Sequence, residues 1–268
     1  MAFLFHESSG AYDGSRRCGF DRYREILERD FKQFMLLNLF TIIAGIPALA
    51  GIAYALFSSS LLLLILFAFI GGAIAGPFLS ALFDSIFRSM RDCHKHYIRR
   101  YFYAAKQNAP LSILIGAVTF CFYGMLLFLF MMWTNVGFPS FLPLVVTLVS
   151  LLLFTMLSML SWFQMLLFDQ SWTKRLLNSI LFVMRYFWKM AAASLILLVS
   201  MVLWLLFLPY TILLLPLTGI WFPAFLVIFT LYSSIDEAFQ LEERIAAAFP
   251  DQSVYYETDQ EWLSRRKK

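Results

Sequence analysis

Long runs of uncharged, mostly apolar residues alternate with short charged segments along this chain. Three stretches contain no Asp, Glu, Lys or Arg, namely residues 33–83, 107–168 and 190–235. The hydrocarbon core of a bilayer is about 30 Å thick, and roughly 20 apolar helical residues cross it. The stretches are 46 to 62 residues long, so each has room for two spans. The pattern predicts six transmembrane helices.

Turn-forming residues inside each stretch predict that the spans are paired as hairpins. Serines occupy positions 58–60 of the first stretch, and Asn, Gly and Pro fall within residues 134–140 of the second. The third stretch contains several Pro and Gly residues, and a break within residues 210–218 leaves two spans of minimal length. We therefore expect an all-α, polytopic membrane helix bundle with six transmembrane helices in three hairpins, accompanied by amphipathic cytoplasmic helices.

The composition and the placement of charge support a membrane protein and give its orientation. Of the 268 residues, 61% are hydrophobic and 14% are charged, whereas about a quarter of an average soluble domain is charged. All 21 Lys and Arg residues lie in the four charged segments, and none lies at a predicted hairpin tip. Basic residues flanking spans are retained in the cytoplasm. We expect a multi-pass protein of the cell (plasma) membrane with both termini cytoplasmic.

These assignments divide the chain into seven segments. The three hairpins occupy residues 34–83, 111–168 and 190–235. The cytoplasmic segments are an N-terminal one with an amphipathic helix (1–33), a basic amphipathic helix (84–110), a basic loop (169–189) and a C-terminal helix with a tail (236–268). Similar basic and aromatic residues precede each hairpin, which fits either a threefold duplication or the general preference for such residues at membrane interfaces.

The basic residues of segment 84–110 are candidates for contact with the lipid bilayer, including its anionic lipids. Apolar and aromatic residues recur there at helical spacing, with cations on the other faces. A helix in the headgroup layer or under the bundle would present those cations to lipid phosphate. The alternative is a solvated continuation of the second span, which would gain little from so many aromatic residues. The candidate contacts are Arg88, Arg91, Lys95, Arg99 and Lys106.

The predicted spans contain uncharged polar residues but no Asp, Glu, Lys, Arg or His. Ion-coupled transporters usually place ionisable groups at membrane depth, so their absence disfavours an ion-coupled pump. One candidate polar face lies on the fourth span, where a solute pathway and helix packing are both open and packing is favoured. Asn38 in the first span has the same two interpretations. The polar face comprises Thr155, Ser158, Ser161 and Gln164.

Small residues in the second span are candidates for close helix packing. Gly72 and Gly76 have the Gly-x-x-x-Gly spacing, and Pro77 follows them and should kink the helix. The motif fits a dimer contact or packing within the chain. We favour packing within the chain, because five other spans offer neighbours.

The sequence contains no motif that predicts catalysis or a cofactor. Cys93, His94 and His96 are close in sequence, but on a helix His94 and His96 would point about 200° apart, so a metal site is disfavoured. No nucleophile elbow, phosphate loop or zinc-protease motif is present. The net charge of +4 needs no nucleic acid, since basic residues at a membrane face account for it. We expect no enzyme, no cofactor and no nucleic-acid partner.

Two stretches of the sequence resemble the YesL family, also called the domain of unknown function 624 family. The first is Leu-Asn-Leu-Phe at 37–40 with Ile-Pro at 46–47, and the second is Gly-Pro at 76–77 followed by the aromatic, basic and Asn residues of 101–108. The chain differs from the family pattern by lacking Thr after Pro47. The resemblance implies an integral membrane protein of a Gram-positive bacterium, whose relatives often accompany carbohydrate uptake and degradation systems.

Three functional hypotheses follow from the sequence. The leading one is a non-enzymatic accessory or regulatory component of a membrane complex, such as a carbohydrate-uptake transporter. The second is a small carrier for a neutral or amphiphilic solute. The third is a lipid-binding or membrane-organising protein.

Overall fold

Helices form almost all of the part of the chain that the computed structural model describes, which is residues 19–91, 97–137, 139–168 and 171–241. Within that part, six helices are long and apolar enough to cross a membrane, which confirms the prediction of an all-α chain with six helices of this kind. The helices are α1 Gly19–Phe57, α2 Leu61–Met90, α3 Tyr97–Val136, α4 Phe141–Leu167, α5 Trp172–Arg185, α6 Phe187–Leu206, α7 Leu208–Thr218 and α8 Trp221–Phe239.

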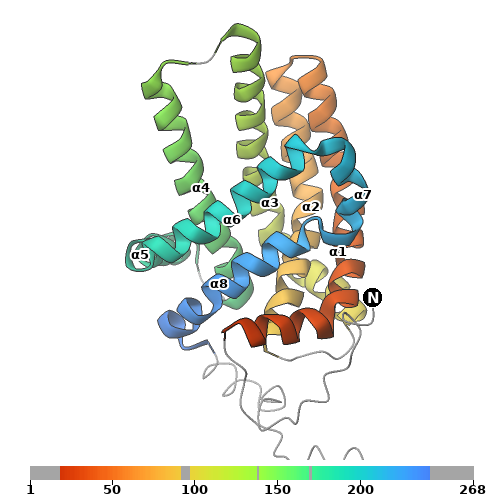
Figure 1. Cartoon of the computed structure of the whole chain (residues 1–268), viewed down its shortest axis with the longest axis vertical. Helices are drawn as coiled ribbons and strands as arrows, with labels where there is room; N and C mark the ends of the chain where they lie inside the picture. Colours follow the sequence, from red (N-terminus) through yellow and green to blue (C-terminus); the bar gives the residue numbers. More distant parts are fainter. Residues whose placement is uncertain (1–18, 92–96, 138, 169–170, 242–268) are drawn as a thin grey trace, which may run out of the picture.

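Two groups of helices differ in direction in Figure 1. Helices α2, α3, α4 and most of α1 follow the long axis of the molecule, while the first turns of α1 lie across its lower end. Helices α6 and α8 cross this group obliquely, and α7 connects them at one side. The spans therefore form one bundle in which the C-terminal helices lie against the first four.

Helix α2 lies very close to both α1 and α3, because small residues line both contacts. A Cβ atom added at Gly72 would lie 2.6 Å from the carbonyl oxygen of Gly116 on α3, and one added at Gly76 would collide with the carbonyl of Ser112. On the α1 side, Gly71 lies against Ala48 in the same manner. Contacts between small residues let helix backbones approach in a bilayer, where apolar burial alone gives no preference for protein over lipid. Pro77 lies inside the continuous helix α2.

Aromatic side chains fill the space between α1 and α8. The ring of Phe34 stacks on that of Trp221 with centroids 5.3 Å apart, and Phe225 contacts both rings. All three side chains are almost fully buried. Aromatic pairs of this kind contribute about 0.5–1.5 kcal/mol beyond the burial of their area, so this cluster fixes the C-terminal helix against the first one.

The structure differs from the predicted segments in three places. Residues 84–110 do not form one separate helix, because α2 continues to Met90 and α3 begins at Tyr97. Residues 169–189 were expected to be a loop, but they contain α5. The expected break within 210–218 is occupied by α7, and the chain is interrupted instead at Phe207 and after Thr218. In the first two cases an apolar helical face, which is stabilised by packing or lipid, keeps part of a charged segment helical.

We expect Gly72→Ala to destabilise the bundle. The added methyl group would overlap the α3 backbone, and overpacking of a close contact typically costs about 1–3 kcal/mol. Gly45→Ala is the matched control, since a Cβ at Gly45 meets nothing within 4 Å and alanine favours the helix. Thermal unfolding in mild detergent should show a lower midpoint for Gly72→Ala only. Equal midpoints for the two variants would contradict the close contact.

Candidate functional site: the charged end of the bundle

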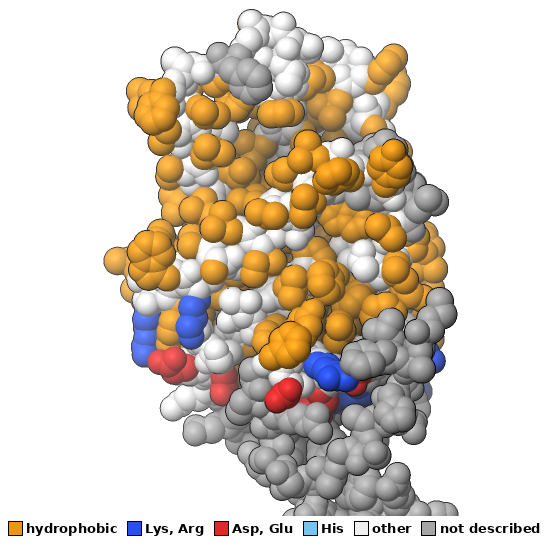
Figure 2. Space-filling model, in the orientation of Figure 1, with side chains coloured by type: hydrophobic (Ala, Val, Ile, Leu, Met, Phe, Trp, Pro, Cys, Tyr) orange, Lys and Arg blue, Asp and Glu red, His pale blue; other side chains and the backbone are white. Residues whose placement is uncertain are grey.

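Charged side chains gather at one end of the molecule. In Figure 2 the visible Lys, Arg, Asp and Glu side chains lie below a broad apolar band that covers the helices. The first turns of α1, the last turns of α2 and the first turns of α3 meet at this end. It is therefore the part of the described chain where electrostatic recognition is available.

Most acidic side chains at this end are paired with cations. Asp30 of α1 is almost fully buried, accepts a hydrogen bond from Ser89 of α2, and lies 2.9 Å from a terminal nitrogen of Arg29. The guanidinium of Arg22 donates to the carbonyl oxygen of Met90 at 2.9 Å. These bonds satisfy carbonyls at the end of α2, where intrahelical partners are lacking. They attach the N-terminal part of α1 to the end of α2.

The residues predicted to contact lipid differ in their burial and in their hydrogen-bond partners. Arg88 is half-buried and its Nε lies 2.7 Å from Asp84, and Arg91 is buried and donates to the carbonyl oxygen of Phe87 at 3.4 Å. Arg99 and Lys106 are exposed, and they make no hydrogen bond or ion pair with the described residues. Lys95 lies outside those residues, as does the Cys-His stretch 92–96.

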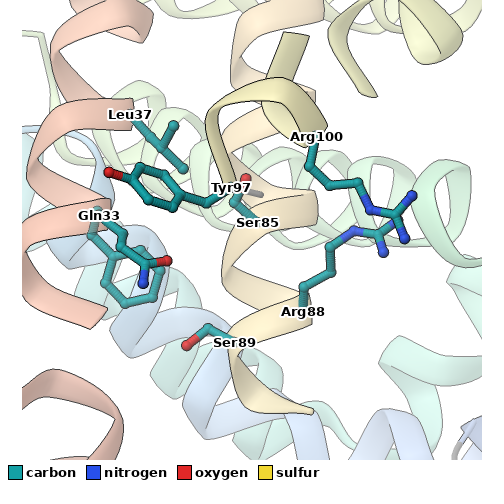
Figure 3. A pocket seen from close by; sticks show the side chains of 8 residues that line it. Gln33, Leu37, Ser85, Arg88, Ser89, Tyr97 and Arg100 are labelled. Atoms are coloured by element: carbon teal, nitrogen blue, oxygen red, sulfur yellow. The ribbon is translucent and has the colours of Figure 1, made fainter. Parts of the chain in front are cut away.

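A small cleft opens at the charged end between α1, α2 and α3. Its volume is about 20 Å³, which is room for one ordered water. Gln33 of α1, Ser85 and Arg88 of α2, and Tyr97 and Arg100 of α3 contribute to its lining. Figure 3 shows the guanidinium groups of Arg88 and Arg100 extending from different helices toward the same side. Arg100 was missed by sequence reasoning, because its meeting with Arg88 depends on how α2 and α3 pack.

The predicted polar face of α4 is directed into helix contacts. Thr155 bonds the Tyr123 hydroxyl of α3 at 3.0 Å, and Ser158 bonds Thr119 of α3 at 3.1 Å. Ser161 donates to the carbonyl of its own helix at Leu157. The hydroxyl contacts of this face thus connect α4 to α3 or stay within α4.

Gln164 connects the end of α4 to α5. Its amide is almost fully buried. In the orientation that matches its neighbours, the nitrogen donates to the carbonyl oxygen of Arg175 at 2.9 Å and the oxygen accepts from the backbone nitrogen of Ser179 at 3.2 Å. Gln164 therefore contacts the backbone of α5 and holds that helix against the bundle.

The side-chain amide of Asn38 on α1 bridges the break between α7 and α8, and we call this bridged break the α7–α8 joint. Its side-chain nitrogen donates to the carbonyl oxygens of Leu215 and Pro216, at 2.9 and 3.0 Å. Its oxygen accepts from the backbone nitrogens of Ile220 and Trp221, at 2.9 and 3.2 Å. The amide thus uses both donors and both acceptor positions. It satisfies carbonyls at the end of one helix and N–H groups at the start of the next.

Helix α5 presents an apolar face away from the bundle. Arg175, Ser179, Phe182 and Val183 are buried, whereas the side chains of the opposite face are exposed. The exposed residues are Leu176, Leu177, Ile180, Leu181 and Met184. Because this spacing is helical, the sequence already contained the signal for α5. An amphipathic helix of this kind lies at the boundary between headgroups and acyl chains.

Comparison of the chain with protein-family models, with curated proteins and with solved structures finds no match. The resemblance to the YesL family therefore stays a prediction.

We expect Asn38→Leu to weaken the joint between α7 and α8. The variant leaves four backbone groups without their side-chain partner, and interhelical hydrogen bonds in membranes contribute about 0.6 kcal/mol each, so the loss should be roughly 2–3 kcal/mol. Hydrogen exchange of the Ile220 and Trp221 amides should accelerate, and the thermal midpoint in detergent should fall.

Thr147→Val is the control for this experiment. Thr147 is half-buried on α4 and donates only to the carbonyl of its own helix at Pro143, so its loss should leave exchange at 220 and 221 unchanged. Unaltered exchange in Asn38→Leu would show that Asn38 does not hold this break.

Proposed function

We propose that this protein is a non-enzymatic accessory component of a plasma-membrane complex that fixes its charged end to anionic lipid. The observation that supports this proposal most strongly is the separation of charge at that end. Four of the five acidic groups of α1 and α2, all except Asp21, are engaged by Arg22, Arg24, Arg29 and Arg88, while cations of α3 and α5 remain exposed. An outward excess of positive charge favours a negatively charged membrane surface.

The aromatic residues beside these cations support the same assignment. Phe102 and Tyr103 lie next to Arg99 and Arg100 in α3, and both are exposed. Aromatic residues favour the headgroup level, where an apolar ring and a polar environment meet. The apolar face of α5 adds a second interfacial element. Together they define a lipid-facing rim at the charged end.

The contacts of the span residues favour an accessory protein over a carrier. A polar pathway through α4 would use Thr155, Ser158 and Gln164, whose polar atoms face α3 and α5 in the structure. Asn38 is the other candidate for such a pathway, and the hydrogen bonds of its side-chain amide are all made to the α7–α8 joint. The resemblance to the YesL family suggests that the complex served is one for carbohydrate uptake.

We expect the lipid that copurifies with the protein to be enriched in anionic species. Phosphatidylglycerol should be enriched over phosphatidylethanolamine in lipid that copurifies in mild detergent, as measured by mass spectrometry. Arg99→Gln combined with Lys106→Gln should reduce the enrichment, while Arg99→Lys with Lys106→Arg should retain it because charge is kept. No enrichment in the unaltered protein would overturn the proposal.

The orientation can be tested separately. We propose that the charged end is cytoplasmic, so that exposed Ser59 and Asn135 lie outside the cell. In a background without the native cysteines, Ser59→Cys and Asn135→Cys should react with an impermeant thiol reagent added to intact cells. Reaction of both only after the membrane is opened would reverse the orientation.

A further inference from the structure

Two arginines from different helices share the cleft at the charged end. Arg88 comes from the end of α2 and Arg100 from the start of α3, and both line the same cavity. In Figure 3 both guanidinium groups extend to the same side, away from Gln33 and Leu37. Two like charges at one small cleft repel each other unless an anion lies between them. The arrangement therefore points to a negatively charged ligand.

The nearby acidic group compensates only one of these charges. Asp84 contacts Nε of Arg88 at 2.7 Å, which leaves the terminal nitrogens of Arg88 without a hydrogen bond to the described residues. Arg100 is exposed and makes no hydrogen bond or ion pair with that part of the chain. Two guanidiniums and one carboxylate carry one net positive charge, which matches the single negative charge of a phosphodiester.

The position of the pair along the helices matches the headgroup layer. Arg88 follows Phe83, the last residue of the uncharged stretch 33–83, by five positions, and Arg100 precedes Lys106 of α3 by six. At 1.5 Å per helical residue these intervals are about 8 and 9 Å. The headgroup region extends beyond the hydrocarbon core by roughly 5–8 Å on each side, and an arginine side chain spans the difference.

The cleft accepts part of a ligand and leaves the rest outside. A volume of about 20 Å³ admits a phosphate oxygen but no larger group. Tyr103 lies one turn further along α3 than Arg100, on the same side of the helix, and it is exposed. Acyl chains attached to the phosphate can therefore run along the exposed apolar surface of α3.

We infer that Arg88 and Arg100 form a site for the phosphate group of one anionic phospholipid. Both guanidiniums donate charge-assisted hydrogen bonds to its oxygens, a geometry that arginine provides and lysine does not. The inference rests on the proposed function and gives it one defined ligand position, distinct from the general enrichment of anionic lipid around Arg99 and Lys106.

Native mass spectrometry of the full-length protein with added phosphatidylglycerol tests the site. The first lipid should bind with higher affinity than later ones, and Arg100→Gln should weaken that first event by about tenfold. Arg24→Gln is the matched control, because it removes the same charge from the charged end at a residue outside the cleft lining that is paired with Glu28, and it should change the first affinity less than about twofold. Arg100→Lys should restore only part of the affinity.

The same experiment distinguishes a bound lipid from free phosphate, and failure of this site from failure of the proposed function. Competition by inorganic phosphate without a preference for phosphatidylglycerol over phosphatidylcholine would replace the lipid by a free phosphate and overturn the lipid assignment. Equal weakening by Arg24→Gln and Arg100→Gln would overturn the site while leaving the enrichment of anionic lipid in place. Unchanged thermal midpoints show that Arg100→Gln is folded, so a loss of binding then reports on the site.

Discussion

The four hydrogen bonds of Asn38 are the interaction on which the arrangement of the C-terminal helices depends. A bilayer offers no water to backbone groups freed by a break in a helix, so such groups need a partner in the protein. The chain breaks between α7 and α8, and a single amide from α1 satisfies two carbonyls and two N–H groups there. The oblique direction of α8 (Figure 1) is compatible with a bilayer because this joint is closed.

The same constraint explains how the other polar residues of the spans are used. Thr155, Ser158 and Gln164 bond to α3 or α5, and Thr41 of α1 bonds the Tyr101 hydroxyl of α3 at 2.7 Å. Gly72 and Gly76 bring α2 against α3 without side chains in between. Polar contacts and the absence of side chains at these glycines thus hold the helices of the bundle together.

The sequence was sufficient for the spans because charge and hydropathy are local properties. The serines at 58–60 end α1 and begin α2, with Ser60 accepting a hydrogen bond from the backbone nitrogen of Leu63. The joint could not be predicted, since Asn38 and Leu215 are 177 positions apart and meet only through tertiary packing. The same limit applies to Arg100, whose proximity to Arg88 follows from the approach of α2 and α3. Helix α5 was predictable from its spacing, but its cations favoured interpretation as a loop.

We propose that polar contacts between the membrane-spanning helices hold the bundle together, while the charged end of the bundle binds anionic lipid. A crystal structure grown in a lipidic mesophase containing phosphatidylglycerol tests both halves at once. We predict the Asn38 amide within hydrogen-bond distance of the backbone at 215, 216, 220 and 221, and headgroup density against Arg88 and Arg100. A water-filled passage beside Asn38, or an empty cleft in the presence of the anionic lipid, would contradict the account.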